Sequence, residues 1–189
     1  VMHKEFGCTL TEKHVEQINI HSRVFNWNEL IPMLPPLLDG LDYIHSKGIT
    51  HRDIKPDNVY LQQTKLFQPK IIDFGAVKVK AKKFKSRYSP LTEGYAPFEQ
   101  ENGLNAIGPW TDVYSIAMTL LRVLSNQFPP SATLRPEPNS NEKDPVIDTL
   151  SMLSSSIPHN VLDALYQATM KHHEERTQSI RQLRNNLGI

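Results

Sequence analysis

Cysteine is the rarest residue in the sequence, with Cys8 the single one among 189 residues. One cysteine cannot form an internal disulfide, and this composition fits a reducing compartment. The chain also lacks an apolar run long enough to cross a bilayer, and residues 1–10 lack the apolar central stretch of a signal peptide. We therefore expect a soluble, cytoplasmic location and no membrane segment in this chain.

An excess of charge of one sign is also missing. The 21 Lys and Arg residues nearly balance the 20 Asp and Glu residues, which leaves a net charge of +1. This balance gives no general attraction to polyanions, so we expect no nucleic-acid partner. The length and the 39% hydrophobic content suffice for one sizeable core, which predicts a single domain over residues 1–189.

Glycine is sparse as well. No set of the eight glycines forms the G-x-G-x-x-G pattern of a loop that cradles phosphates. The lysines that precede residue 53 are Lys4, Lys13 and Lys47, and none stands in a V-A-I-K-like strand. The chain begins with Val1 rather than methionine, which suggests that further sequence lies upstream.

The spacing of hydrophobic residues predicts a mainly helical chain. An apolar stripe over residues 34–45 has helical spacing and stops before Gly48. Residues 111–124 are apolar around most of the circumference, which predicts a buried helix with Thr111 or Asp112 as its cap. Two short β-like runs, residues 58–61 and 70–72, flank a polar turn and predict a hairpin. The remaining predicted elements are helices at about 146–153, 160–171 and 178–187, and loops at 76–92 and 128–145.

The stretch "HRDIKPDN", residues 51–58, carries groups suited to phosphoryl transfer. Asp53 can orient an acceptor hydroxyl and take its proton. Lys55 can offset charge on the transferring phosphate, and the amide oxygen of Asn58 is a suitable ligand for Mg²⁺. A lone Asp or Asn would more often cap a turn, but the eight residues together favour the chemical interpretation.

A second motif, "IIDFG", spans residues 71–75. A short apolar strand ends at Asp73, whose carboxylate can bridge Mg²⁺ to phosphates, and Gly75 allows the backbone to turn sharply. The tripeptide D-F-G alone is weak evidence. Its position 20 residues after Asp53, behind a predicted hairpin, strengthens the prediction of a metal ligand.

A third motif, "LTEGYAPFEQ", spans residues 91–100. In this order and spacing, the three motifs resemble the large C-terminal lobe of a eukaryotic-type protein kinase. The combination of "NVYL", "GYAPFEQ", "GPWTDVYSIAMTL" and "PPSATLR" is similar to bacterial members of the family. Lys55 resembles the serine/threonine class. The resemblance extends from Val1 to about Leu187 and implies an α+β, mainly α-helical fold: the hinge and C-terminal lobe of a protein-kinase-like domain, with a short β-hairpin at the catalytic loop.

The resemblance implies roles for the motif residues. Asp53 would be the catalytic base and Lys55 the phosphate contact, and Thr92 would contact the catalytic aspartate and help to select the acceptor. Asn58 and Asp73 would bind Mg²⁺. ATP would meet the backbone of Lys4, Glu5 and Phe6 at its adenine edge, with Val59, Tyr60 and Leu61 as the floor of the pocket.

Other residues of the resemblance would be structural. His51 would pack on Phe74, which lies next to Gly75. Glu99 would form a buried pair with Arg176. Asp112 would accept backbone N–H bonds from His51 and Arg52. Apart from the resemblance, Arg52 directly precedes Asp53, so a phosphate in the predicted loop at residues 76–92 would have a cationic partner.

The small, sheet-rich N-terminal lobe has no counterpart in the sequence. One hypothesis is a segment of an active kinase that needs this lobe in order to phosphorylate a protein serine or threonine. A second is a truncated relative that binds partners without catalysis. The intact set of Asp53, Lys55, Asn58 and Asp73 favours the first. A small-molecule kinase of related fold is a third possibility, against which Lys55, "GYAPFEQ" and the expected Glu99 pair argue.

Overall fold

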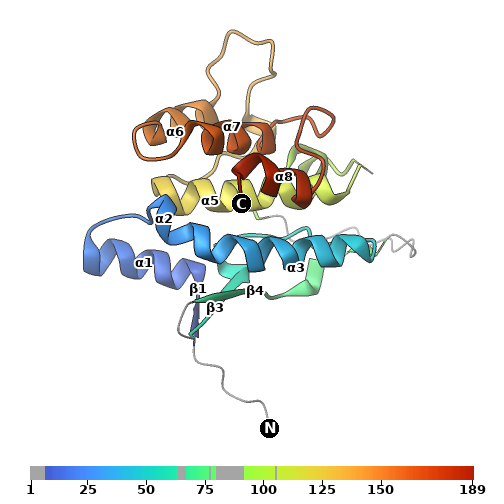
Figure 1. Cartoon of the computed structure of the whole chain (residues 1–189). Helices are drawn as coiled ribbons and strands as arrows, with labels where there is room; N and C mark the ends of the chain where they lie inside the picture. Colours follow the sequence, from blue (N-terminus) through green and yellow to red (C-terminus); the bar gives the residue numbers. More distant parts are fainter. Residues whose placement is uncertain (1–6, 64–66, 77, 80–91, 105) are drawn as a thin grey trace.

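Helices make up most of the chain in the computed structural model, which describes residues 7–63, 67–76, 78–79, 92–104 and 106–189 (Figure 1). The helices are α1 (Leu10–His21), α2 (Trp27–Leu30), α3 (Leu34–Ser46), α4 (Phe98–Glu101), α5 (Pro109–Ser125), α6 (Pro145–Leu153), α7 (His159–Ala168) and α8 (Ile180–Leu187). Single 3₁₀ turns are η1 (Ile31–Met33), η2 (Pro56–Asn58), η3 (Phe74–Ala76) and η4 (Ala132–Leu134). The predicted helices in the second half of the chain are present, although the predicted helix at 160–171 ends at Ala168.

Two small sheets accompany the helices. The antiparallel order β1 (Gly7–Thr9), β3 (Val59–Gln62), β4 (Gln68–Ile71) forms the first, and β2 (Ile49–Thr50) pairs with β5 (Lys78–Val79) in the second. The predicted hairpin is confirmed, since β3 and β4 are antiparallel neighbours. The prediction of a loop over residues 76–92 is wrong at β5. Two-residue strands are too short to show an alternating pattern, so they cannot be recognised without their partner.

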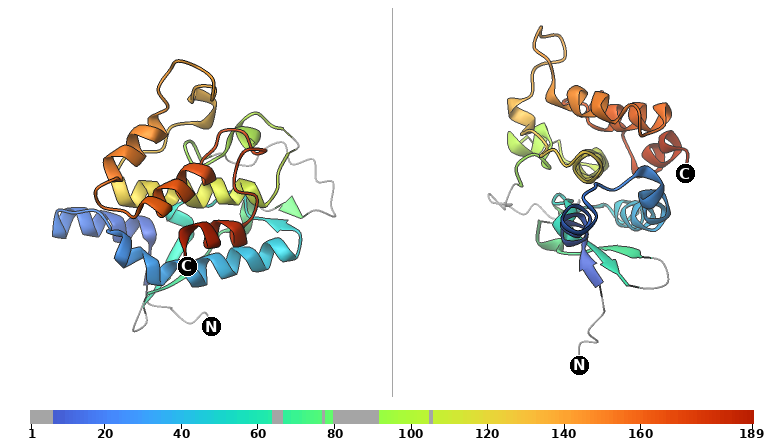
Figure 2. Two further views of the ribbon diagram at one scale, coloured as in Figure 1. Left: turned by 45° about the horizontal axis from the view of Figure 1, so that its top comes forward. Right: turned by 90° about the vertical axis from the view of Figure 1, so that its left-hand side faces the viewer.

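The helices lie in layers above the three-stranded sheet. In Figures 1 and 2 the sheet lies on one side of α1 and α3, α6 and α7 lie on the far side, and α5 lies between them. This arrangement surrounds α5 with protein, which matches its nearly continuous apolar surface. Ile54, Val59 and Leu61 belong to the same hydrophobic core, so residues 51–62 rest directly on it.

The start of α5 differs from the prediction. Gly108 is the N-cap, and Thr111 in the first turn accepts a hydrogen bond from the Gly108 N–H at 3.3 Å. Pro109 occupies the first helical position, where its fixed φ and missing N–H cost nothing. The prediction that Thr111 or Asp112 caps the helix is therefore wrong, and the Asp112 carboxylate is available for another partner.

Helix α1 was absent from the predicted elements, although it has 12 residues. Thr9 and Glu12 form a reciprocal capping box at its start. Two of its three buried residues are polar, His14 and Gln17, so an apolar stripe is missing. Hydrophobic spacing cannot reveal a helix whose buried face is polar.

Helix α8 packs on α3, far away in the sequence. Ile180, Leu183 and Leu187 of α8 are buried, as are the apolar residues that define the stripe of α3. Arg184 of α8 forms an ion pair with Asp39 of α3, 145 positions earlier. The stripe ends where it was predicted to, since Gly48 adopts a φ of 72° just after α3.

The segment between α5 and α6 is fixed by buried cations. The Arg135 guanidinium pairs with Asp144 at 2.6 Å and donates to the Thr169 carbonyl at 2.6 Å. Lys171 in turn donates to the Arg135 carbonyl at 2.6 Å. These contacts tie residues 128–145, predicted as a loop, to the segment that follows α7.

Glu99 of α4 and Arg176, between α7 and α8, form the expected pair. The two nitrogen–oxygen distances are 2.8 and 3.1 Å, and the side chains are 2% and 0% exposed. Glu99 also accepts from Thr111, and Arg176 donates to the Met170, Lys171 and Trp110 carbonyls. The pair therefore connects α4, α5 and the segment before α8.

Replacement of Arg176 by Ala should lower the free energy of unfolding by about 3–5 kcal/mol, because Glu99 would remain as an uncompensated buried charge. Urea unfolding of the variant and the wild type measures this difference. Arg181→Ala is the matched control: its side chain is 79% exposed and reaches Asp42 only at 3.4 Å, so no measurable change is expected. An unchanged unfolding midpoint for Arg176→Ala would contradict the prediction.

Candidate active site

The stretch of residues 51–58 links β2 to β3 and ends in the turn η2. Ile54, in its middle, is fully buried in the hydrophobic core. Packing of Ile54 fixes the backbone of this stretch. The polar residues Asp53 and Asn58, on either side of Ile54, are also buried. The backbone of the stretch is therefore held by packing as well as by hydrogen bonds.

Asp112 of α5 holds the start of this stretch. Its two carboxylate oxygens accept the N–H groups of His51 and Arg52, each at 2.8 Å. The Nε2 atom of His45, at the end of α3, lies 2.7 Å from Asp112 Oδ2. Arg52 adopts a φ of 74°, a left-handed conformation that side chains rarely take, and the fully buried carboxylate stabilises it.

Three side chains converge on the carboxylate of Asp53. Thr92 Oγ1 donates to Oδ1 at 2.8 Å, and Lys55 Nζ lies 3.1 Å from Oδ2. Lys55 Nζ also donates to Thr92 Oγ1 at 2.7 Å. Asn58 Nδ2 donates to Oδ2 at 2.9 Å and to the Asp53 carbonyl at 2.8 Å. Residues that are up to 39 positions apart in the sequence thus form one polar cluster.

The orientation of Asn58 leaves its amide oxygen for another partner. Both of its N–H bonds go to Asp53, and an amide oxygen is an acceptor and a possible ligand for a hard cation. Asp73, two residues after the strand β4, is exposed and has a φ of 60°. Its Oδ1 accepts from the Gly75 N–H at 3.1 Å, and a Cβ at Gly75 would lie 3.0 Å from this oxygen.

His51 and Phe74 are in contact, as the resemblance implied. Their ring centroids lie 4.9 Å apart with an edge-to-face angle of 64°. Burial lowers the pKa of His51 below its ordinary value, although the charge of Asp112 opposes this shift. His51 is therefore neutral near pH 7 and packs in the core, while Phe74 remains 48% exposed on its other side.

The structure describes some of the residues predicted to contact adenine. Lys4, Glu5 and Phe6 lie outside the described residues. Along β3 the side chains alternate, so Val59 and Leu61 point into the core and are each 1% exposed. Tyr60 faces the other side, and the floor formed by these three residues stays a prediction.

Tyr60 lies next to Gly7 of β1. A Cβ at Gly7 would come within 2.8 Å of the Tyr60 ring and within 2.3 Å of the Leu61 carbonyl oxygen. Glycine is therefore required for the close approach of β1 to β3. Of the three residues predicted as the floor, Tyr60 alone lies on the outer face of this sheet.

Two residues with direct contacts to the site were not predicted. Gln100, next to Glu99 in "GYAPFEQ", donates from Nε2 to the Arg52 carbonyl at 2.8 Å. His45 contacts Asp112 from α3. The signal for each is a polar side chain in a buried position: Gln100 adjoins Glu99, and His45 ends a stripe that is otherwise apolar.

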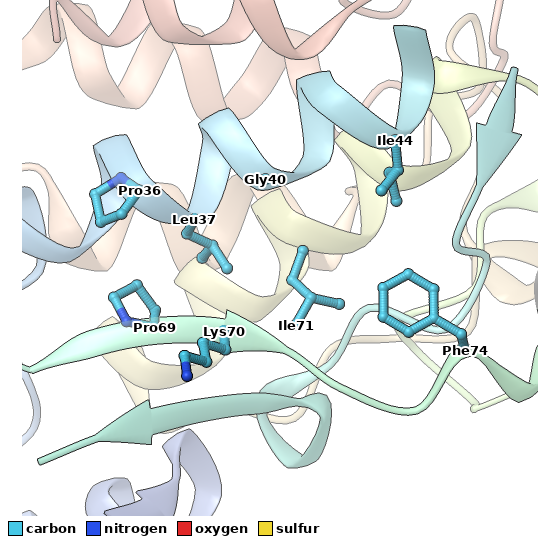
Figure 3. Close-up of a pocket in the computed structure, with 8 residues that line it drawn as sticks. All are labelled: Pro36, Leu37, Gly40, Ile44, Pro69, Lys70, Ile71 and Phe74. Carbon is cyan, nitrogen blue, oxygen red and sulfur yellow. The ribbon is translucent and has the colours of Figure 1, made fainter. Parts of the chain in front are cut away.

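A pocket of about 370 Å³ opens beside the site, between α3 and β4 (Figure 3). Its lining is mostly apolar and comprises Pro36, Leu37, Gly40, Ile44, Pro69, Lys70, Ile71 and Phe74. A Cβ at Gly40 would meet no atom within 4 Å among the described residues. Phe74, at one end of this lining, is 48% exposed.

Comparison with known proteins gives a consistent family. A sequence model described as "Protein kinase domain" matches residues 7–187. The "Serine/threonine-protein kinase PknA" of Nostoc sp. is 36% identical over 143 residues, which cover 72% of this chain and 24% of that protein. "Serine/threonine-protein kinase D" of Synechocystis sp. is 36% identical over 117 residues, covering 54% of this chain and 23% of that protein. The chain thus spans about a quarter of the length of these relatives.

The solved structures agree in fold. The structure "PpkA-294 apo form" has a TM-score of 0.74 and 26% identity, and the match covers 97% of this chain and 60% of that one. The Rad53 kinase domain, solved with AMPPNP, has a TM-score of 0.65 at 20% identity and shows the fold alone. The predicted protein-kinase-like, mainly helical fold is confirmed.

Each helix of the described ranges is too short or too polar to cross a membrane.

Replacement of Asp112 by Asn should lower the free energy of unfolding by about 1–3 kcal/mol. The amide keeps one acceptor oxygen, so one of the buried N–H groups of His51 and Arg52 loses its partner. Urea unfolding measures the change. Asp148→Asn on α6 serves as the control, because Asp148 is partly exposed and pairs with the exposed Lys143. Equal stability of Asp112→Asn and the wild type would contradict the role given to this carboxylate.

Proposed function

The chain belongs to the protein kinase domain family, and we propose that it carries the catalytic base and the metal ligands of a serine/threonine kinase. The reaction is transfer of the γ-phosphoryl group of ATP to a serine or threonine hydroxyl of a protein. The observation that carries this proposal is the polar cluster in which Thr92, Lys55 and Asn58 all contact the Asp53 carboxylate.

Asp53 is the base in this proposal. The hydroxyl of the acceptor would bind one carboxylate oxygen, which orients the attack on the γ-phosphorus and takes the proton as the new O–P bond forms and the bond to the β-phosphate oxygen breaks. Asn58 and Thr92 fix the plane of the carboxylate. Lys55, held by Thr92 at 2.7 Å, lies where its ammonium can offset charge on the transferred phosphoryl group.

Mg²⁺ fits the oxygen atoms that the chain offers. Magnesium prefers one or two carboxylate or carbonyl oxygens together with phosphate oxygens and water. Asp73 supplies an exposed carboxylate, and Asn58 supplies the amide oxygen that its own hydrogen bonds leave free. When bound, the ion would neutralise charge on the β- and γ-phosphates. The described residues hold no cluster of three or more His, Cys, Asp or Glu at metal-binding distances, so phosphate oxygens would complete the site.

We further propose that an N-terminal lobe completes the enzyme and that the protein acts in the cytoplasm. The sequence contains neither a glycine-rich loop nor a lysine in a V-A-I-K-like strand. The pocket between α3 and β4, with the exposed side chain of Phe74, presents an apolar surface that this lobe would cover. Binding without catalysis is a weaker alternative, because a binding module has no need for a complete set of base, phosphate contact and metal ligands.

Asp53→Asn tests the assignment of the base. In a protein that includes the N-terminal lobe, this variant should lose phosphoryl transfer by a factor of about 10²–10⁴, because the amide keeps the shape of the carboxylate but cannot take a proton. Incorporation of labelled phosphate into a protein substrate measures the loss. Asp163→Asn on the exposed face of α7 is the control and should retain wild-type turnover. Near-wild-type turnover by Asp53→Asn would refute the assignment.

The 189 residues alone should transfer phosphate at a negligible rate, since phosphoryl transfer depends on positioning that the chain supplies only from one side. The measurement compares the chain alone with the same chain joined to its N-terminal lobe, at equal ATP and Mg²⁺ concentrations. The Asp53→Asn form of the joined protein provides the background. Comparable incorporation by the two proteins would show that the lobe is dispensable.

A further inference from the structure

The short helix α4 sends consecutive side chains to three different parts of the fold. Glu99 pairs with Arg176, and Glu101 accepts from Ser131 and from the backbone of Thr133. Between them, Gln100 donates to the Arg52 carbonyl at 2.8 Å. Gln100 thus projects toward the catalytic loop from an element that is fixed on both sides.

The carbonyl that Gln100 contacts belongs to the peptide bond between Arg52 and Asp53. The plane of this peptide sets the direction in which the Asp53 side chain leaves the backbone. On its N–H side, the contact that the described residues provide is from Asp53 N to His51 Nδ1, at 3.4 Å. On its carbonyl side it has the 2.8 Å bond from Gln100, which is therefore the stronger constraint.

The conformation of Arg52 makes this constraint necessary. Its φ of 74° lies in the left-handed region, so the backbone relaxes to a commoner conformation unless both neighbouring peptides are held. Asp112 accepts the Arg52 N–H on one side of the α-carbon. Gln100 binds the Arg52 carbonyl on the other side, and the two side chains come from different helices, α5 and α4.

We propose that Gln100 is a positioning residue for phosphoryl transfer, which fixes the peptide plane that leads into Asp53 and thereby the direction of the catalytic carboxylate. The inference rests on the proposed function. Gln100 does not touch the reacting atoms and acts through the backbone of Arg52. Its side chain is only 5% exposed, and an apolar residue of similar shape would fill the space without the amide.

A second pair of atoms supports this role. Among the described residues, Gln100 Oε1 and Arg52 Nε are both buried without a hydrogen-bond partner. One is an acceptor and the other a donor, on two residues that are already joined by the carbonyl bond. The buried acceptor of Gln100 and the buried donor of Arg52 are thus complementary in kind.

The test compares Gln100→Met with the wild type in the protein that includes the N-terminal lobe. Methionine keeps the length and volume of the side chain but cannot donate to the Arg52 carbonyl. The first measurement is amide hydrogen exchange, in which the Arg52 and Asp53 amides should exchange roughly tenfold faster. The second is steady-state kinetics, in which kcat should fall roughly tenfold while KM for ATP stays within about twofold.

Gln178→Met is the matched control. The amide of Gln178 also donates to backbone carbonyls, those of His173 and Arg176, each at 2.6 Å. Its loss should leave both the exchange of Arg52 and Asp53 and the kcat at wild-type values. The folded fraction of every variant is measured by circular dichroism at the assay temperature, so that kcat refers to folded protein.

Two results would overturn the proposal: unchanged exchange at Arg52 and Asp53 in Gln100→Met, or a fall in kcat no larger than the fall in folded fraction. If the wild-type protein transfers no phosphate, the proposed function fails. The exchange measurement still decides whether Gln100 holds the peptide, because it needs no activity.

Discussion

A single buried carboxylate, that of Asp112, holds the start of the stretch of residues 51–58. Removal of this charge from water is costly, and the hydrogen bonds from His51, Arg52 and His45 repay that cost. Because α5 is surrounded by core residues, the position of the Asp112 carboxylate is fixed by packing. The backbone of His51 and Arg52 is fixed in turn by its hydrogen bonds to this carboxylate. The left-handed conformation of Arg52, and hence the placement of Asp53, depends on this interaction.

The site is supported from two directions. Asp112 holds the loop from α5, while the buried pair of Glu99 and Arg176 fixes α4, which lies next to the loop. Between these supports, the side chains of Thr92 and Asn58 donate hydrogen bonds to the Asp53 carboxylate. Such preorganisation is what phosphoryl transfer requires, since the protein contributes position and charge rather than a covalent step.

Much of the fold and of the site could be predicted from the sequence, because the motif residues stand at fixed short spacings. The hairpin β3–β4, the helix α5 and the contact between His51 and Phe74 could all be predicted from local patterns or from the family resemblance. The roles of Asp53, Lys55, Thr92, Asn58 and Asp73 remain predictions, although their geometry suits them.

The helix and the contacts that were not predicted leave no local signal in the sequence, for two reasons. The buried face of α1 is polar at His14 and Gln17, so no hydrophobic period marks the helix. The bonds of Gln100 and His45 join segments that are 48 and 67 positions apart, and no local pattern contains the partner.

The packing of α8 on α3 bears on how this chain acquires its structure during synthesis. The ion pair of Asp39 and Arg184 joins residues 145 positions apart, and Leu183 of α8 is fully buried. On the ribosome, α3 would therefore emerge long before the helix that covers it, with part of its apolar stripe open to water. Nascent chains that stall before residue 180 should be natural substrates for chaperones that shield hydrophobic surface.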